Sequence, residues 1–214
     1  VTTMPPARIM VNKTVWDGTA WVEGIDNAKI GDTYMMRCEV HNGGSSGMDL
    51  TDIEVWDVIS PSLAYADSAR LRTPDGIWRS IEPPTSTSTG PNGETIVNWT
   101  INNYLQNNLM LQPCQTLVIE YNVSVVNYGN DTNTQFAKGW CDAVHAWIVG
   151  NDTAYINAPK PDLVVSDITI NYDASGVGGK AVGPRPGPGV KTECNNISAV
   201  IEEDSGIDVV FPFN

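Results

Sequence analysis

Apolar side chains recur at every second position along most of this chain, and this periodicity limits its possible folds more than any other feature. Residues 33–40 and 52–59 both follow the pattern, and five of the eight side chains at the intervening positions are polar or charged. A β-strand sends successive side chains to opposite faces, so the pattern predicts strands with one buried face. Turn-forming runs such as residues 41–47 and 82–93 separate them. We therefore predict an all-β chain with an immunoglobulin-like β-sandwich, in which only residues 102–111 are compatible with a helix.

The charge balance and the absence of long apolar runs exclude two classes of function. The 214 residues include 12 Lys and Arg against 25 Asp and Glu, a formal net charge of −13. An acidic chain repels the phosphates of a nucleic acid, so we expect no nucleic-acid partner. The longest uncharged runs have the length of strands, whereas a membrane helix needs roughly 18 apolar residues. We therefore expect no direct membrane span.

A change of composition near residues 158–161, Ala-Pro-Lys-Pro, marks a domain boundary. Beyond it, a Gly- and Pro-rich stretch at residues 175–189 cannot join a sheet. Three strands are predicted in this part of the chain, at residues 162–170, 195–203 and 207–213. An immunoglobulin-like sandwich needs about seven strands, so we expect this second domain to be incomplete. Either the sequence is a fragment of a longer chain, or the neighbouring domain or another subunit supplies the missing strands. We predict two domains, residues 1–157 and residues 158–214.

The four cysteines indicate the compartment in which the protein works. They lie far apart and form no C-x-x-C pair, which disfavours a structural zinc site. Disulfides are the preferred interpretation and would place the protein outside the cytoplasm, but three pairings are possible and free buried thiols are the alternative. The disulfide candidates are Cys38, Cys114, Cys141 and Cys194.

Six N-x-S/T triplets provide a second extracellular signal. The Asn, Ser and Thr content predicts about three such triplets by chance, so six is an excess. Several of these asparagines alternate with apolar residues in predicted strands, and the others fall in turn-like stretches, so a glycan on any of them would face water. We expect N-linked glycans at these positions and a secreted, cell-surface location. The candidate acceptors are Asn12, Asn98, Asn122, Asn130, Asn151 and Asn196.

A series of spaced turn motifs runs through residues 8–157. They are Val-Asn-Lys-Thr-Val at 11–15, Ile-Gly-Asp-Thr-Tyr at 30–34, Val-His-Asn-Gly-Gly at 40–44, Val-Trp-Asp-Val-Ile-Ser-Pro-Ser-Leu-Ala-Tyr at 55–65, Asn-Trp-Thr-Ile at 98–101 and Leu-Gln-Pro-Cys-Gln-Thr-Leu at 111–117. This pattern resembles a repeat family of prokaryotic surface proteins, the eleventh in the series of domains of unknown function. Cys114 stands where that family usually has Gly.

The segment that follows the boundary is similar to a second surface module, the cell-adhesion-related domain found in bacteria, CARDB. Lys-Pro-Asp-Leu-Val-Val-Ser-Asp-Ile at residues 160–168 resembles its opening strand, and residues 196–213 resemble its next two. Residues 202–205, Glu-Glu-Asp-Ser, depart from the N-x-G turn of that family, and its later strands are absent. Both resemblances imply immunoglobulin-like folds in secreted or wall-attached proteins, especially of methanogenic archaea, and neither implies catalysis.

Residue clusters that could bind a ligand are few. Residues 43–47 match G-x-S-x-G, but the segment that follows has strand periodicity, whereas a nucleophile elbow leads into a helix. We predict no catalytic residue and no enzyme activity. Asp17, Asp26 and Asp32 lie in one turn-rich stretch and are weak calcium candidates, with an ordinary solvated loop as the alternative. Four tryptophans on polar faces or in loops could stack on a sugar or fill an interface, or could be partly buried under loops: Trp16, Trp21, Trp56 and Trp78.

These observations predict a structural glycoprotein of the cell surface that assembles with itself into a filament, a sheath or an S-layer-like coat. Strand edges and sheet faces would supply the contacts, and other cell-surface components are the remaining expected partners. The alternative is a carbohydrate-binding or cell-binding adhesion module of a larger surface protein. No cofactor is expected apart from N-linked glycans and the weak calcium candidates.

Overall fold

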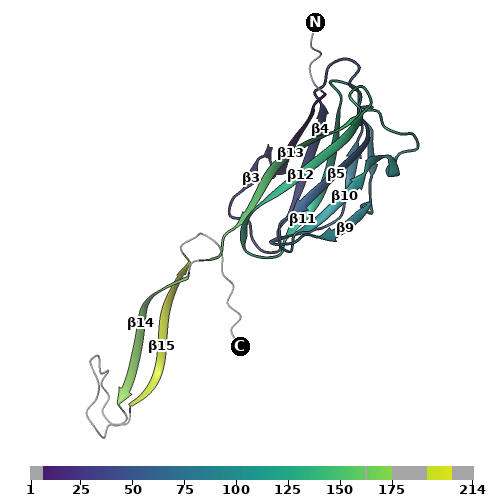
Figure 1. Ribbon diagram of the computed structural model, residues 1–214. Coiled ribbons are helices and arrows are strands. Elements are labelled where there is room, and N and C mark those ends of the chain that lie inside the picture. The colour runs from purple at the N-terminus through teal and green to yellow at the C-terminus, as the bar shows by residue number, and fades with distance from the viewer. Residues whose placement is uncertain (1–6, 162, 175–191, 204–214) are drawn as a thin grey trace. The chain divides into compact units, whose positions relative to one another are not determined.

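The computed structural model describes residues 7–161, 163–174 and 192–203. The chain divides into two compact units, Val1–Pro159 and Lys160–Asn214, and each is considered by itself. Almost all of the described elements are strands, as predicted (Figure 1). The identity of each unit with a particular surface module stays a prediction.

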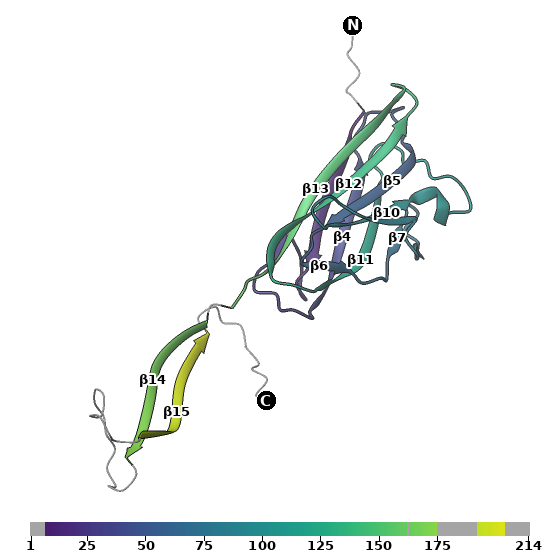
Figure 2. The ribbon, with the colours of Figure 1, turned by 60° about the horizontal axis from the view of Figure 1, so that its bottom comes forward.

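The first unit consists of two sheets that lie face to face (Figures 1 and 2). One sheet has the strand order β2 (Trp21–Val22), β1 (Ile9–Trp16), β4 (Thr33–Asn42), β11 (Thr116–Val125), β7 (Arg70–Arg72) and β8 (Trp78–Ser80), and β6 (Leu63–Tyr65) also pairs with β11. The other has the order β3 (Gly24–Ile25), β13 (Ala146–Ala158), β12 (Gly129–Cys141), β5 (Thr51–Ile59), β10 (Thr95–Thr100) and β9 (Ser86–Thr89). Described neighbours in these sheets run antiparallel except β3 and β13, which run parallel.

The core lies between the sheets and is built from the alternating apolar positions. On β4, Met36, Cys38 and Val40 are fully buried, while the residues between them are half-buried. Trp99 of β10 and Tyr121 of β11 are the largest buried side chains, with ring centroids 5.1 Å apart. The predicted all-β, immunoglobulin-like sandwich is therefore confirmed.

Two local features differ from simple alternation. On β11, Glu120 is buried although it faces away from the core, because Arg37 and Arg70 each place a guanidinium nitrogen 2.5 Å from one of its carboxylate oxygens. In the helix-compatible stretch, only a single 3-10 turn forms, η1 (Ile101–Tyr104). A run this rich in Asn has little intrinsic helix propensity, so no longer helix forms there.

The described part of the second unit is a two-stranded antiparallel sheet of β14 (Leu163–Ala174) and β15 (Thr192–Glu203). These strands cover two of the three predicted strands. The predicted loop at residues 175–189 and the predicted strand at residues 207–213 lie outside the described residues.

Candidate functional site

The outer face of the second sheet carries a row of four side chains that links two acceptor asparagines through an aromatic pair. Asn98 of β10 lies opposite Trp56 of β5, Trp56 lies opposite Phe136 of β12, and Phe136 lies opposite Asn151 of β13. The Trp56 and Phe136 rings stack with centroids 5.2 Å apart and an interplanar angle of 7°. We call these four residues the outer row. A glycan on either asparagine would start directly beside an aromatic surface.

The other acceptor asparagines with described side chains also reach the surface. Asn12 of β1 is exposed and donates a hydrogen bond of 3.4 Å to Glu39. Asn122 of β11 is half-buried, and Asn130 near the start of β12 is exposed. The side chain of Asn196, on β15, lies outside the described residues. The structure therefore leaves five of the six acceptors accessible, and their glycosylation stays a prediction.

Two of the predicted surface tryptophans carry cations on their faces. The Trp16 and Trp21 rings lie 5.4 Å apart, and the Arg37 guanidinium lies 3.9 Å from the Trp21 centroid. Trp78 is exposed, with the guanidinium of Arg70 4.6 Å from its ring centroid. Contacts of this kind contribute about 0.5–1 kcal/mol at exposed sites, so these rings stabilise the sheet edges as well as offering surface for a ligand.

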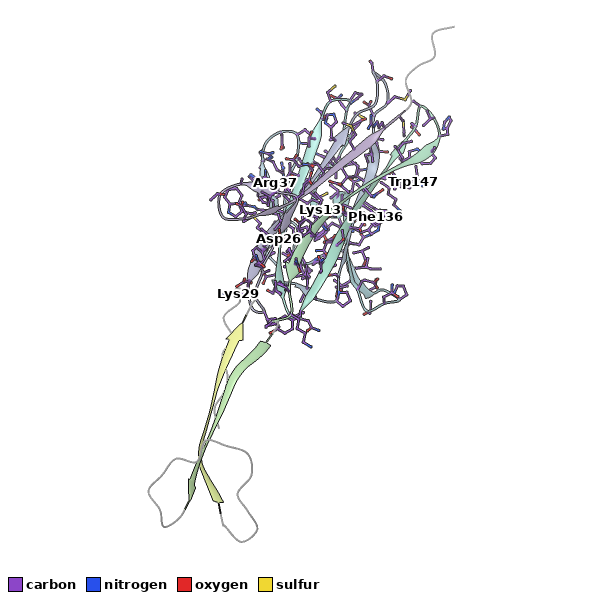
Figure 3. All side chains as sticks on the ribbon, turned by 90° about the vertical axis from the view of Figure 1, so that its left-hand side faces the viewer. Lys13, Asp26, Lys29, Arg37, Phe136 and Trp147 are labelled. Atoms are coloured by element: carbon purple, nitrogen blue, oxygen red, sulfur yellow. The ribbon has the colours of Figure 1, made fainter. Side chains whose placement is uncertain are left out.

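Sequence analysis missed an aromatic pair at the surface. Trp140 and Trp147 face each other across the β12–β13 hairpin at 5.7 Å, and 46% of Trp147 is exposed. Lys138 places its ammonium 4.8 Å from the Trp147 ring centroid (Figure 3 labels Trp147). Trp147 and Val149 share odd parity with Asn151 on β13, so the strand alternation could have placed both on the outer face.

The predicted calcium candidates do not converge. Asp17 accepts hydrogen bonds from the Thr19 and Ala20 backbone N–H groups within its own turn, at 2.7 Å each. Asp32 accepts bonds from the Lys29 backbone N–H and the Tyr34 hydroxyl, and Asp26 is exposed. Across the described residues, no three acidic, His or Cys side chains are placed to hold a metal ion. The carboxylates of Asp17 and Asp32 therefore satisfy local backbone donors, which is the ordinary role of Asp in a turn.

The structure forms no disulfide among the three described cysteines, and the disulfides stay a prediction. Cys38 and Cys141 are buried free thiols, and Cys114 is an exposed free thiol. Cys38 lies on the first sheet and Cys141 on the second, and each fills its own place in the core. The side chain of Cys194 lies outside the described residues.

A buried polar cluster in the core was also missed. Lys13 of β1, Asp57 of β5, Tyr121 of β11 and Gln135 of β12 converge between the sheets (Figure 3 labels Lys13). Nζ of Lys13 lies 2.5 Å from Oδ1 of Asp57, and the Tyr121 hydroxyl lies 2.5 Å from Oδ2 of Asp57 and 3.0 Å from Oε1 of Gln135. We call these four residues the inner cluster.

The electrostatics of the inner cluster follow from its burial. Desolvation lowers the pKa of Lys13 from its ordinary value, although Asp57 opposes this shift. Desolvation likewise raises the pKa of Tyr121 well above its ordinary value, so its hydroxyl keeps its proton. Lys13 and Asp57 both occupy the odd, apolar register of their strands, and this signal was present in the sequence.

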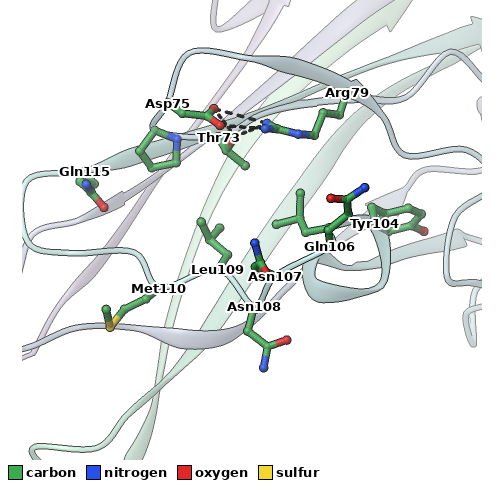
Figure 4. A pocket seen from close by; sticks show the side chains of 12 residues that line it. Thr73, Asp75, Arg79, Tyr104, Gln106, Asn107, Asn108, Leu109, Met110 and Gln115 are labelled. Carbon is green, nitrogen blue, oxygen red and sulfur yellow. Dashed lines mark hydrogen bonds and ion pairs between the residues drawn. The ribbon is translucent and has the colours of Figure 1, made fainter.

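A surface hollow with a volume of about 700 Å³ lies between the turn around Asp75 and the loop that follows η1 (Figure 4). Its only charged side chains, Asp75 and Arg79, form an ion pair at 2.7 Å. The rest of the lining is mainly amide and aliphatic side chains. The charged groups of this hollow therefore neutralise each other.

Comparison with known proteins yields similar folds at low identity. No family model and no curated protein matches the chain. The C-terminal domain of the antigen I/II polypeptide BspA of Streptococcus agalactiae is 13% identical, with a TM-score of 0.39 over 69% of this chain and 49% of that one. The major pilin SpaD from Corynebacterium diphtheriae is 11% identical, with a TM-score of 0.49 over 89% and 50%. AvmM, which catalyses macrocyclization in alchivemycin A biosynthesis, is 11% identical, with a TM-score of 0.43 over 72% and 89%.

The matched region therefore spans about half the length of the BspA and SpaD chains. Similarity at these identities and TM-scores assigns no function to the chain. Among the described residues, no helix has the length and apolar character needed to cross a membrane.

Proposed function

We propose that the chain is a structural glycoprotein of the extracellular cell surface that associates with copies of itself and with other surface components. The observation that carries the proposal is the placement of the acceptor asparagines. All five with described side chains are accessible, and two of them flank the aromatic pair of the outer row. A glycan at each could point into water without displacing a core side chain.

The second unit supplies a route to assembly. β14 and β15 each contain 12 residues, and in the described residues each pairs only with the other. An isolated two-stranded sheet is marginal in water, and its outer edges present unpaired N–H and C=O groups. Strands from a neighbouring subunit would pair with these edges, as in other cases of strand addition. The filament, sheath or S-layer-like coat that we propose would be built through such joints.

The experiment that tests assembly is light scattering on the native, non-reduced protein, with negative-stain imaging of the same sample. Regular filaments, sheets or a defined oligomer would support the proposal. A monodisperse species with the mass of one chain would contradict it. Peptide mass spectrometry before and after enzymatic glycan removal would test the glycans, because each occupied Asn becomes Asp when the glycan is released.

The exposed Trp140–Trp147 pair favours a second candidate function, a carbohydrate-binding or cell-binding adhesion module. Flat aromatic rings beside a cation are suited to stacking on a sugar. Titration of the protein with an oligosaccharide panel, followed by tryptophan fluorescence, would detect binding. A Trp147→Ala variant should abolish it, whereas Trp78→Ala serves as a control on a different sheet.

A further inference from the structure

A primary amine and a carboxyl group meet in the interior of the sandwich. The side chains of Lys13 and Asp57 both have zero exposure, and their nearest nitrogen and oxygen atoms lie 2.5 Å apart. The backbone N–H of Lys13 donates a 2.8 Å hydrogen bond to Oδ2 of Asp152 on β13. This bond, together with the pairing of β1 with β4, holds Lys13 with its side chain directed into the core. The Lys13 amine and the Asp57 carboxyl group are therefore held in contact and shielded from solvent.

Tyr121 determines which oxygen of the carboxyl group is held. Its hydroxyl lies 2.5 Å from Oδ2 of Asp57 and 3.0 Å from the Gln135 amide oxygen, but a hydroxyl has one proton to donate. The Nε2 atom of Gln135 has no partner in this orientation. A half-turn of the Gln135 amide exchanges its oxygen and nitrogen. The amide nitrogen then has a hydrogen-bond partner, and the Tyr121 hydroxyl has a single acceptor for its one proton. Gln135 then donates to Tyr121 and Tyr121 donates to Oδ2, so Oδ2 is stabilised as charge develops on it.

We propose that Lys13 and Asp57 condense within the folded chain to form an intramolecular amide. The neutral Nζ attacks Cγ of the protonated carboxyl group, and an Nζ–Cγ bond forms. Oδ2 stays as the carbonyl oxygen and accepts the Tyr121 hydrogen bond. The Cγ–Oδ1 bond breaks, and Oδ1 leaves as water with its own proton and one proton from Nζ. The reaction needs no oxidant, reductant or co-reactant, and it does not depend on the proposed assembly.

Burial favours each requirement of this reaction. Burial disfavours the charged form of an amine, and desolvation lowers the pKa of Lys13 from its ordinary value, which favours the neutral Nζ that attacks. Holding two reactants in contact makes the reaction intramolecular, and well-oriented intramolecular reactions reach effective molarities of about 10⁵–10⁸ M. Exclusion of bulk water also favours condensation over hydrolysis. The surface pair Lys138–Glu54, at 3.0 Å and about 30% exposed, lacks these conditions and serves as an internal control.

The test is the intact mass of the purified full chain, produced without glycosylation and measured after denaturation. We expect the mass calculated from the sequence minus one water. The Lys13→Met variant should retain the full calculated mass, whereas Lys138→Met should still lose one water. Because an Asp can also lose water by closing on its own backbone, a loss that persists in Lys13→Met would overturn the proposal.

Peptide mapping of the unmutated protein tests the proposal independently, even if the Lys13→Met variant fails to fold. Trypsin should not cleave after Lys13, and a branched peptide should join the segments that contain Lys13 and Asp57. Recovery of both residues in linear, unmodified peptides would overturn the proposal. Loss of one ammonia, with the branch at Gln135, would also overturn it by assigning the bond to the neighbouring amide.

The role of Tyr121 can be tested by timing. Newly refolded Tyr121→Phe protein should lose water more slowly than the unmutated chain, by about tenfold or more, because one hydrogen bond to a developing oxyanion is removed. Circular dichroism should show an unchanged fold at the start of the time course. Equal rates in the two proteins would exclude Tyr121 from the reaction.

Discussion

Strand β5 contributes a carboxylate to each of two lysine pairs, and the two pairs lie on its opposite faces. Asp57 points into the core and meets Lys13 at 2.5 Å with no exposure, whereas Glu54 points outward and meets Lys138 at 3.0 Å with about 30% of each side chain exposed. The residue types and distances are similar. The difference lies in exposure to water. Solvent screens the Lys138–Glu54 pair, which therefore contributes little to stability. Removing one partner of the buried Lys13–Asp57 pair should be strongly destabilising.

The largest effect should follow from breaking the inner pair. Asp57→Ala leaves Lys13 buried without its partner, which should cost about 3–5 kcal/mol of unfolding free energy. If the amide forms, the variant also loses a crosslink between residues 44 apart, which contributes about 4 kcal/mol by the loop-entropy relation. Urea unfolding followed by tryptophan fluorescence measures the difference.

A double variant separates charge burial from the crosslink. Asp57→Leu combined with Lys13→Met replaces both polar groups by apolar side chains of similar volume, so it should be more stable than Asp57→Ala. If Asp57→Ala lowered the unfolding free energy by less than about 1 kcal/mol, the Lys13–Asp57 pair would behave like a surface pair. That result would contradict the contrast between the inner and outer pairs.

A smaller effect is expected for Tyr121→Phe. This change removes the hydroxyl that lies 2.5 Å from the buried carboxyl group and keeps the aromatic ring that packs on Trp99. Loss of a hydrogen bond to a charged or polarised group should cost about 1.5–3 kcal/mol. The same urea experiment applies, with Tyr104→Phe, a half-buried hydroxyl at the surface, as the matched control.

The outer pair should contribute little. Glu54→Gln should lower the unfolding free energy by at most about 1 kcal/mol, because solvent screens the interaction with Lys138. The difference from the unmutated protein should shrink further as salt is raised from low to high concentration. A salt-independent loss of several kcal/mol would show that this pair is not screened and would remove the contrast with the inner pair.

The smallest effect should come from the exposed pair of Asp75 and Arg79. Hydrogen bonds from Arg79, Thr73 and the Ile77 backbone hold the pKa of Asp75 well below its ordinary value of 3.8. A carboxyl group with a lowered pKa contributes stability above its unfolded-state pKa and loses it as the pH falls through the folded-state value. Asp75→Asn should therefore be slightly less stable at neutral pH and equal to the unmutated protein in strong acid, as measured by thermal unfolding across pH.

The alternation of apolar residues predicted much of the first unit because strand parity is a local property. Alternation puts Trp99 and the acceptor Asn98, its neighbour, on opposite faces, and the structure buries Trp99 fully while Asn98 is half-buried. The same rule applied to Lys13 and Asp57 would place both side chains inward, but a single charged residue among the apolar positions of a strand does not reveal its partner. The sequence could not choose among the three disulfide pairings for a related reason, because spacing along the chain carries no information about which sheet a cysteine joins.

The sequence by itself determined the all-β character of the described residues, several of the longer strands of the first unit, and which face many of their side chains occupy. These properties depend on neighbours one or two residues apart. The tertiary structure decided that Lys13 meets Asp57 beside Tyr121, and that Asn98 and Asn151 flank one aromatic pair. Such meetings depend on strand register and on how two sheets stack, and many weak contacts distributed over the whole core set that arrangement.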